Sequence, residues 1–311
     1  MSKYAFGVDI GGTTVKLGLF DKEGNILDKW EIPTILDNEG AAILPDIAKS
    51  IRGKMEEKGI SEADLVGIGM GVPGTVDKKG NLGGCANIAW KSFNIPEAVQ
   101  AYINVPVKAG NDANVAAFGE MWKGAGKGHE NVVAVTLGTG VGGGIIVEGE
   151  ILAGSIGGGG EIGHIHVEDN ETESCGCGKK GCLEEYASAT GIARLARRRL
   201  EKDDKPSVLR GGHISAKTVF DAVKEGDAVA IEVAEEFGRY LGKGLGIIAG
   251  VVNPELFVIG GGVSKAGEIL LTFVEPWFRK YVYRECANAK IVLAQLGNDA
   301  GIIGAVGMVL R

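Results

Sequence analysis

The N-terminal residues alternate between short apolar runs and a glycine-rich turn. Two apolar segments, at 4–10 and 15–20, flank the turn Gly11-Gly12-Thr13-Thr14. Apolar segments on both sides of a glycine turn are typical of a β-hairpin. A third apolar segment at about 26–32 predicts another strand, which extends the hairpin into a three-stranded meander.

The same pattern returns near the middle of the chain. It predicts an apolar strand at 132–138, a glycine turn at 139–144, a returning strand at 145–147 and a short segment at Ile151-Leu152. Residues 5–33 and 132–153 are therefore two versions of one unit, in which a strand, a Gly/Thr turn and a second strand lead to a turn and a third strand. This repeat predicts two halves built on related sheets.

Apolar periodicity predicts alternating helices and strands in the rest of the chain. Helices are expected at 40–58, 112–122, 187–201, 227–250, 265–283 and 299–310, and strands at 65–71, 105–109, 256–260 and 290–296. The predicted fold class is α/β, with two domains that face each other across a central cleft. We place a small domain at 1–111 plus 299–311 and a large domain at 112–298.

Composition narrows the possible functions. A length of 311 residues fits two domains of about 150 residues each. The formal net charge of −7 argues against nucleic acid as a partner. The most apolar stretch, 244–263, is interrupted by Asn253-Pro254-Glu255, which argues against a membrane span. The charged residue Asp9 follows Lys3 after only five residues, which leaves no apolar segment long enough for an export signal. We therefore expect a cytoplasmic protein.

Two glycine turns are candidate phosphate-binding loops. Bare glycines let backbone N–H groups approach phosphate oxygens, and threonine adds hydroxyl donors. Asp9, at the end of the first strand, is suited to hold Mg²⁺ through water. The alternative for the turn after Asp9 is a simple hairpin. The second turn, 138–144, contains a formal G-x-G-x-x-G, but Ile145-Ile146-Val147 predicts a strand after it, and a dinucleotide-binding motif opens a helix.

Two further motifs have both a functional and a structural interpretation. Asn111-Asp112 follows a strand, so Asp112 is a candidate general base, but both residue types also favour helix N-caps. Gly261 and Gly262 lie between a strand and a helix, where they form either an adenosine-binding turn or a plain connection.

Three cysteines within eight residues, together with an upstream histidine, predict a metal site. His164, Cys175, Cys177 and Cys182 make up a standard tetrahedral zinc set, and four protein ligands indicate a structural ion. His166 is a rival fourth ligand, and buried free thiols are the alternative to any metal site. Four consecutive glycines, 157–160, precede Glu161 and suggest a loop that presents Glu161 and His164 to a ligand.

Together these motifs resemble the ROK family, which contains repressors and sugar kinases. The resemblance extends from Asp9 to the terminal helix. Its most specific part is Gly160-Glu161-Ile162-Gly163-His164, followed by the three cysteines and Glu184, and the continuation 185–188 (Glu-Tyr-Ala-Ser) is similar to the glucokinase branch. The resemblance implies an actin-like (ribonuclease H-like) two-domain fold and phosphorylation of glucose at its 6-hydroxyl by ATP with Mg²⁺.

The resemblance also implies roles for matching residues. Asp112 is implied to be the catalytic base and to contact the sugar. The other implied sugar contacts are Asn87, Asn111, Glu161, His164 and Glu184. The implied nucleotide-binding residues are Asp9, Gly11, Gly12, Thr13, Thr14, Gly138, Thr139, Gly140, Gly261 and Gly262. The implied ligands of a structural Zn²⁺ are His164, Cys175, Cys177 and Cys182.

Other functional classes fit the sequence less well. A non-enzymatic, sugar-responsive regulator of the family would carry an extra N-terminal helix-turn-helix domain, for which we expect no room before residue 9. A plain ATPase is disfavoured by the polar residues around the cysteines. Among kinases, the alternative substrates are fructose, mannose, N-acetylmannosamine and N-acetylglucosamine, and polyphosphate is an alternative donor. Because relatives are commonly homodimers, we expect a homodimer or a higher homo-oligomer.

Overall fold

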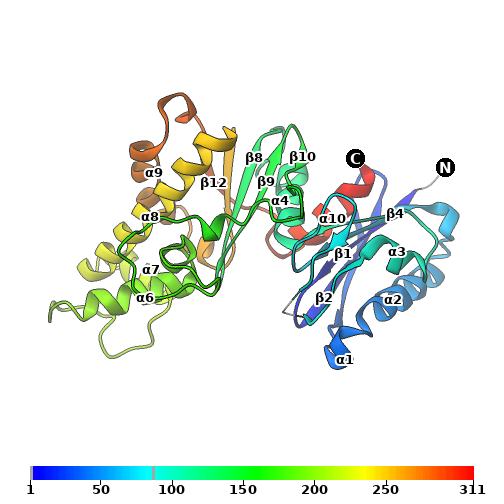
Figure 1. Cartoon of the computed structure of the whole chain (residues 1–311), viewed down its shortest axis with the longest axis horizontal. Helices are drawn as coiled ribbons and strands as arrows, with labels where there is room; N and C mark the ends of the chain where they lie inside the picture. The colour runs from blue at the N-terminus through cyan, green and yellow to red at the C-terminus, as the bar shows by residue number, and fades with distance from the viewer. Residues whose placement is uncertain (1–2, 86–87) are drawn as a thin grey trace. The chain divides into compact units, whose positions relative to one another are not determined.

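The computed structural model describes residues 3–85 and 88–311. The chain divides into two compact units (Figure 1). The first unit comprises residues 1–128, 144–160 and 296–311, and the second comprises residues 129–143 and 161–295.

The first unit contains a five-stranded sheet with the strand order β3-β2-β1-β4-β7. The strands are β1 (Tyr4–Ile10), β2 (Thr14–Asp21), β3 (Ile26–Pro33), β4 (Leu65–Val72) and β7 (Val107–Asn111). The helices are α1 (Asp37–Gly40), α2 (Ile43–Lys58), α3 (Ile95–Gln100), α4 (Asp112–Lys123) and α10 (Ala300–Leu310). Strands β5 (Asn81–Leu82) and β6 (Phe93–Asn94) form a small separate pair.

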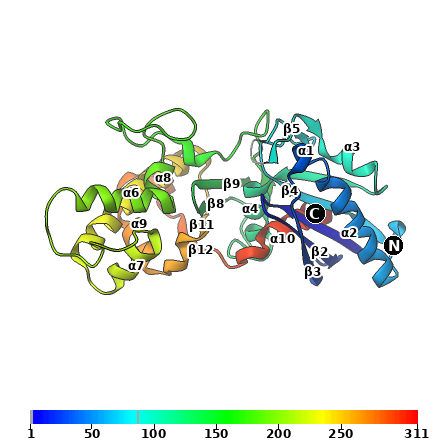
Figure 2. The same cartoon turned by 90° about the horizontal axis from the view of Figure 1, so that it is seen from below.

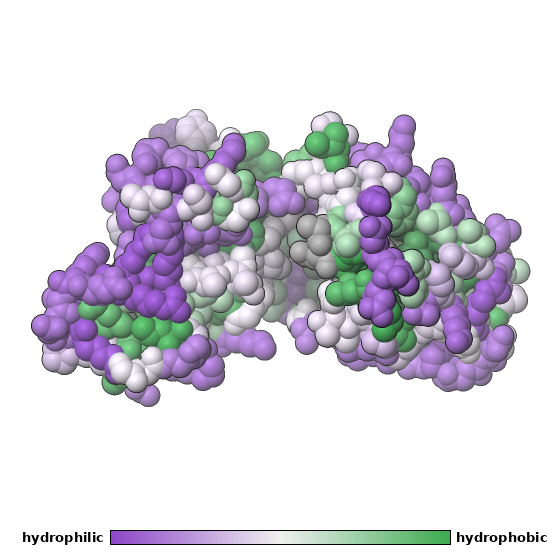
Figure 3. Space-filling model, turned by 60° about the horizontal axis from the view of Figure 1, so that its bottom comes forward, coloured by the Kyte–Doolittle hydropathy of each residue, from purple (hydrophilic) through white to green (hydrophobic). Residues whose placement is uncertain are grey.

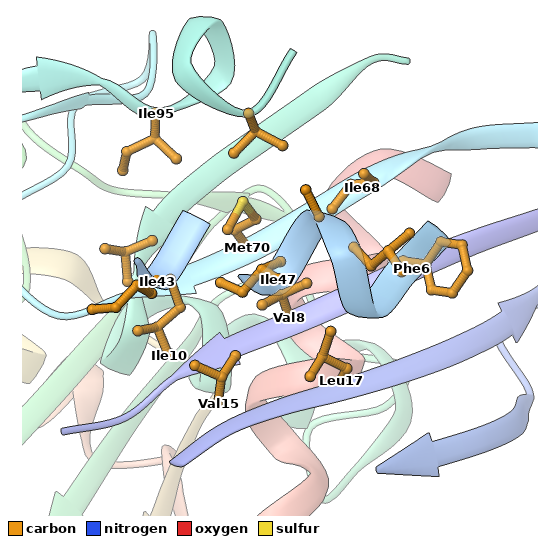
Figure 4. Close-up of a cluster of buried hydrophobic side chains, with 14 of the residues drawn as sticks. Phe6, Val8, Ile10, Val15, Leu17, Ile43, Ile47, Ile68, Met70 and Ile95 are labelled. Atoms are coloured by element: carbon orange, nitrogen blue, oxygen red, sulfur yellow. The ribbon is translucent and has the colours of Figure 1, made fainter. Parts of the chain in front are cut away.

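Strand β1 alternates its side chains between two layers of this unit. Phe6, Val8 and Ile10 point to one face, where they pack with Ile43 and Ile47 of α2 (Figure 4). Because β1 is covered on both faces, its sequence is almost continuously apolar instead of alternating.

Helix α10 covers the other face of β1. Ala5 packs with apolar side chains of this helix, and a β-carbon on Gly69 of β4 would overlap the carbonyl oxygen of Ala305. The helix can therefore lie close to the sheet only because glycine occupies this position. Asp9 lies on the same face as Ala5, four residues along the strand, and this places its carboxylate against Gly301 at the first turn of α10.

A second five-stranded sheet has the order β10-β9-β8-β11-β12. Its strands are β8 (Val132–Leu137), β9 (Val141–Val147), β10 (Glu150–Ile151), β11 (Leu256–Gly260) and β12 (Lys290–Leu293). Helices α5 (Glu184–Ala187), α6 (Ala189–Leu200), α7 (Ala216–Lys224), α8 (Ala228–Val252) and α9 (Ile269–Tyr281) belong to the second unit, where α6 to α9 gather beside β11 and β12 (Figure 2).

The predicted repeat is confirmed, because the two sheets have the same strand order: a three-stranded meander followed by two further strands. Strand β9 begins at Val141, earlier than the predicted 145, and the prediction of a glycine turn over 139–144 is wrong in this respect. Glycine suits this part of the strand because a β-carbon on Gly144 would collide with Ala117 and Asn114 of α4. The rejection of a dinucleotide-binding motif is confirmed, since a strand follows the second turn.

Other element boundaries also differ from expectation. Helix α9 begins at Ile269 and not at 265, because a 3-10 turn (Val263–Ala266) ends at Gly267, whose φ is +87°. The strand expected at 105–109 begins at Val107 in the structure, since Pro106 has no N–H to donate. Helix α7, capped by Ser215, was not predicted.

The division into units differs from the boundary expected after residue 111. Helix α4 and residues 144–160 group with the N-terminal part. The physical reason is the close packing of α4 on α10, where a β-carbon on Gly304 would overlap the carbonyl oxygen of Val115.

Among the described residues, no helix is both long and apolar enough to cross a membrane, the 25-residue α8 included. The face shown in Figure 3 is largely hydrophilic, with scattered apolar patches.

Candidate functional site

Asp9 and Asp112 lie close together in the first unit. Strands β1, β4 and β7 are parallel neighbours, so their carboxyl ends share one edge of the sheet. A β-carbon on Gly71 of β4, the middle strand, would lie 3.5 Å from Oδ1 of Asp9 and 3.6 Å from Cα of Asp112. Ligands of open α/β sheets bind at this edge.

Asn111 and Asp112 begin helix α4. Asn111 is the N-cap, since its Oδ1 accepts a hydrogen bond from the N–H of Asn114 at 3.1 Å. Its Nδ2 donates to the carbonyl oxygen of Gly74 and to Oδ1 of Asp112, both at 3.0 Å. Oδ1 of Asp112 also accepts from the N–H of Ala113 at 2.8 Å. The capping interpretation is therefore confirmed for Asn111, and two donors hold the Asp112 carboxylate in one orientation.

The environment of Asp9 disfavours its charged form. The pKa of Asp9 is raised from 3.8 to about 6, chiefly by burial; the positive charge of Lys16 opposes the shift, and the negative charge of Asp112 contributes to it. A bound cation would reverse this effect, because a positive charge beside a carboxylate stabilises the ionised form. Asp9 therefore fits the role of a cation-holding group.

Replacement of Asp9 with asparagine should stabilise the ligand-free protein at neutral pH. Because the folded-state pKa is raised to about 6, the native protein binds more protons than the unfolded chain between about pH 4 and pH 6. Stability is therefore lost as the pH rises through this interval, by up to about 3 kcal/mol. Asp9→Asn should remove this loss and raise the unfolding temperature at pH 7.5 by several degrees.

Thermal unfolding between pH 4 and pH 8 checks this prediction. The matched control is Asp221→Asn, because Asp221 is an exposed carboxylate paired with Lys217 and has a lowered pKa. This control should keep the wild-type slope between pH 4 and pH 6. Superimposable curves for wild type and Asp9→Asn would show that Asp9 does not carry the shift.

The turn between β1 and β2 offers open backbone. The N–H of Gly11 donates to the carbonyl oxygen of Thr14 at 3.0 Å, which closes the turn. Gly12 and Thr13 at its tip are exposed, and a β-carbon on Gly12 would meet no atom within 4 Å. Packing among the described residues does not account for glycine at position 12, whereas close approach of a ligand would.

The predicted metal ligands are brought together in the second unit. The donor atoms of His164, Cys175, Cys177 and Cys182 all lie within 4.8 Å of one another. Backbone pairing assembles them, since the N–H of Leu183 donates to the carbonyl oxygen of Ile165 at 2.9 Å and Cys182 lies opposite His166, so that Cys182 is held against the segment that follows His164. A tight turn over 175–179 then returns the other two cysteines to the same place.

The geometry of this cluster fits a zinc ion. Sγ of Cys177 lies 3.6 Å from Sγ of Cys182, and Sγ of Cys175 lies 3.7 Å from Nδ1 of His164. Tetrahedral zinc with Zn–S bonds of about 2.3 Å and Zn–N bonds of about 2.0 Å separates its ligands by about 3.5–3.8 Å. His166 does not join the cluster, since its Nε2 lies 2.8 Å from Oδ1 of Asp169 and its Nδ1 lies 3.0 Å from the carbonyl oxygen of Lys180.

Glu184 connects the cysteine cluster to the turn between β8 and β9. Its Oε1 lies 2.9 Å from Sγ of Cys175 and 3.6 Å from Nδ1 of His164. Its Oε2 accepts from the N–H of Val141 at 3.4 Å and would lie 2.6 Å from a β-carbon on Gly140. A side chain at position 140 would therefore displace Glu184, so this glycine is also required for packing.

The glycines after β11 differ from each other. Gly261 has a φ of +84°, and a β-carbon there would lie 2.6 Å from the backbone N and O of Leu137, so the fold itself requires glycine. Gly262 is exposed, and its β-carbon would meet no atom within 4 Å. Of the two, Gly262 is thus the one that leaves open space for a ligand.

The predicted residues fall into two groups. The first unit holds Asp9, the turn Gly11-Gly12-Thr13-Thr14, Asn111 and Asp112. The second unit holds Gly138, Thr139, Gly140, Glu161, His164, the three cysteines, Glu184, Gly261 and Gly262. Glu161 is exposed and directly precedes the short 3-10 helix Ile162–His164. Asn87 lies outside the described residues.

Two residues that border these groups were not predicted. Asn114 is buried on α4, and its Nδ2 donates to the carbonyl oxygen of Gly159 at 3.2 Å. The sequence offered a signal for this residue, because Asn114 is a polar residue within an otherwise apolar stretch of the predicted helix. Glu171, which lies between His164 and Cys175 in the sequence, is buried. Its neighbours in the sequence are acidic and polar and are typical of a solvated loop.

Comparisons with known proteins agree on one family. The model of the ROK family matches residues 5–311. The glucokinase of Halalkalibacterium halodurans is 44% identical over 308 residues, which cover 97% of this chain and 93% of the relative. The crystal structure of a ROK family glucokinase from Streptomyces griseus in complex with glucose and AMPPNP is 36% identical, with a TM-score of 0.76 over 98% of each chain. The xylose repressor of Bacillus subtilis is 28% identical over 99% of this chain and 77% of the relative.

These similarities cover almost the entire chain and include both sheets and the cysteine cluster. The fold is the actin-like α/β fold of the ROK sugar kinases, as predicted. From the family match and the 44% identity we conclude that this chain belongs to the ROK family.

Proposed function

We propose that this protein is a glucokinase, which transfers the γ-phosphoryl group of ATP to the 6-hydroxyl of glucose. The observation that carries the proposal is the Asp112 carboxylate, held by Asn111 and Ala113 at the start of α4 next to Asp9. The similarity to glucokinases over nearly the whole chain supports the choice of glucose and ATP.

Asp112 is the proposed general base. Phosphoryl transfer needs a nucleophile that is oriented in line and loses its proton as the new bond forms. The two hydrogen bonds to Oδ1 fix the plane of the carboxylate, so the group can accept the proton of a sugar hydroxyl without rearrangement. Asn111 positions Asp112 and is also a proposed sugar contact, together with Asn87.

The glycine turns are the proposed phosphate-binding segments. Exposed backbone at Gly12 and Thr13 in the first unit, and at Thr139 in the second, offers donors to phosphate oxygens. Asp9 would hold Mg²⁺, which neutralises phosphate charge when bound. Gly261 and Gly262 are proposed to lie next to the adenosine of the bound nucleotide.

The cysteine cluster is the proposed zinc site. His164, Cys175, Cys177 and Cys182 would hold a Zn²⁺ ion, whose role is structural because four protein ligands fill its coordination sphere. Nδ1 of His164 faces Sγ of Cys175; with the ion bound to Nδ1, Nε2 would carry the proton and could donate it to a sugar hydroxyl. Glu161 and Glu184 are proposed acceptors for other sugar hydroxyls.

Steady-state ADP release over a panel of sugars tests the proposal. With MgATP, kcat/KM should be highest for glucose, followed by mannose, fructose, N-acetylglucosamine and N-acetylmannosamine in any order. A different sugar in first place would reject glucose as the substrate but keep the kinase class. No turnover with any of the five would favour a regulator, a class to which the related xylose repressor belongs.

A further inference from the structure

The segment between His164 and Cys175 contains a carboxylate that the proposed mechanism does not use. The Glu171 side chain is only 1% exposed, although the residues around it in the sequence are mostly polar. A buried carboxylate needs several donors to replace the water it loses. The donors that bind Glu171 show which parts of the chain this residue joins.

Glu171 receives side-chain donors from two helices. Oη of Tyr186 on α5 donates to Oε2 at 2.6 Å. Arg198 on α6 binds both oxygens, with Nη1 at 3.0 Å from Oε2 and Nη2 at 2.8 Å from Oε1. Nη2 of Arg194 lies 3.1 Å from Oε2. Hydrogen bonding to Arg198 strongly lowers the pKa of Glu171, so the residue is an anion that faces two arginines.

Helix α5 also carries Glu184, which contacts the cysteine cluster. Tyr186 follows Glu184 by two residues and Cys182 by four. Its ring stacks on Tyr240 of α8, with the ring centroids 3.8 Å apart. The bond between Glu171 and Tyr186 thus joins the segment before Cys175 to the segment after Cys182.

A second attachment holds the start of the same segment. Oη of Tyr240 donates to Oε2 of Glu168 at 2.9 Å, and Nζ of Lys243 donates to the carbonyl oxygen of Val167 at 2.6 Å. Both donors are on α8. The chain between His164 and Cys175 is therefore fixed to α8 and α6 by protein groups alone.

We propose that Glu171 is a positioning residue, which anchors the metal-binding segment to α5 and α6 and thereby sets the geometry of the zinc ligands and of Glu184. The inference rests on the proposed function, because it assigns Glu171 to the sugar side of that reaction. It predicts that the segment is partly ordered before the metal binds.

Loss of the anion should weaken the site and not only the fold. Glu171→Gln replaces the buried anion with a neutral amide, so Arg194 and Arg198 lose one of their carboxylate partners, and breaking a buried ion pair is unfavourable. Supporting residues around a metal site typically change metal affinity by about 10- to 100-fold. Glu171→Gln should therefore release zinc on the order of tenfold faster and raise the glucose KM several-fold, with the ATP KM unchanged within about twofold.

Two further variants make the experiment specific. Tyr186→Phe removes one hydrogen bond but keeps the ring that stacks on Tyr240, and it should change zinc release and the glucose KM in the same direction by less. Glu173→Gln is the matched control, because Glu173 pairs with the same two arginines but is 57% exposed, and it should behave as wild type. If Glu171→Gln does not fold, Tyr186→Phe decides the result.

Three measurements are made on the full chain of each variant. They are zinc release to a chromogenic chelator, the KM values for glucose and ATP, and hydrogen–deuterium exchange over 165–183 in chelator-treated protein. Faster exchange and faster zinc release in Glu171→Gln than in Glu173→Gln are the expected results. Equal rates in the two variants, or an equal rise of both KM values, would overturn the inference.

Failure of the proposed function gives a different pattern. If the wild type phosphorylates no sugar, the kinase proposal fails, but zinc release and exchange still test whether Glu171 positions the segment. If the wild type holds no zinc, exchange over 165–183 decides the matter alone, and slow exchange in the wild type with fast exchange in Glu171→Gln supports the inference.

Discussion

Asp112→Asn should lower kcat for glucose phosphorylation by on the order of 10² to 10⁴, which is the usual effect of removing a general base. The amide keeps the size of the side chain and can still accept the hydrogen bonds that Asn111 and Ala113 donate to Oδ1. It cannot take a proton from the sugar hydroxyl. Glucose affinity, measured by calorimetry, should stay within about tenfold of the wild type.

A matched control separates catalysis from helix capping. Asp227 is the N-cap of α8 and accepts hydrogen bonds from the N–H groups of Val229 and Ala230, so Asp227→Asn alters a helix start without a proposed catalytic role. It should keep kcat near the wild-type value. If Asp112→Asn is as active as Asp227→Asn, then Asp112 is a helix-start residue and not the base.

Cys177→Ser should reduce zinc from one ion per chain to nearly none. Structural zinc sites contribute on the order of 10 kcal/mol to the folding of their segments. Because Glu184 contacts Cys175 and lies near His164, loss of order in the cluster should raise the glucose KM by on the order of tenfold. The ATP KM should change much less.

Elemental analysis and steady-state kinetics measure these two effects. Cys286→Ser is the matched control, because Cys286 is a buried free thiol far along the chain from the cluster, and this variant should keep its zinc. An active wild-type enzyme with almost no zinc would refute the site. An unchanged glucose KM in zinc-free Cys177→Ser would show that the cluster does not order the sugar-binding residues.

Local patterns in the sequence predicted most of the sheet structure. The Gly/Thr turns and the apolar runs beside them gave β1, β2 and β8, and the repeat they form is confirmed by the matching strand orders. The position of Asp9 could also be predicted in part, since a residue at the end of a central strand lies at the sheet edge. Its neighbour Gly301 could not, because nearly 300 residues separate the two in the chain.

The metal cluster shows where sequence spacing stops being informative. His164 and His166 are both close enough in the chain to serve as the fourth ligand. Backbone pairing does not decide between them, because Cys182 lies opposite His166 in the pairing. The side chains decide, since a ring nitrogen of His164 lies within 4.8 Å of the three sulfur atoms while Nε2 of His166 lies 2.8 Å from Oδ1 of Asp169. These side-chain directions depend on tertiary contacts and have no local sequence signal.

Buried charge was the other feature that sequence analysis missed. Glu171 lies in an acidic segment, and charged residues are almost never fully buried unless they are paired. Its partners Arg194 and Arg198 lie in a basic run that looks like a solvated helix face. Only the packing of the segment on α6 turns the two runs into one cluster.

Phosphorus NMR of the product formed from glucose and MgATP tests the proposed function most directly. We expect one phosphate ester, at the 6-hydroxyl, that appears together with an equal amount of ADP and is formed far more slowly by Asp112→Asn. ADP release without a sugar ester, or an ester at another hydroxyl, would contradict it.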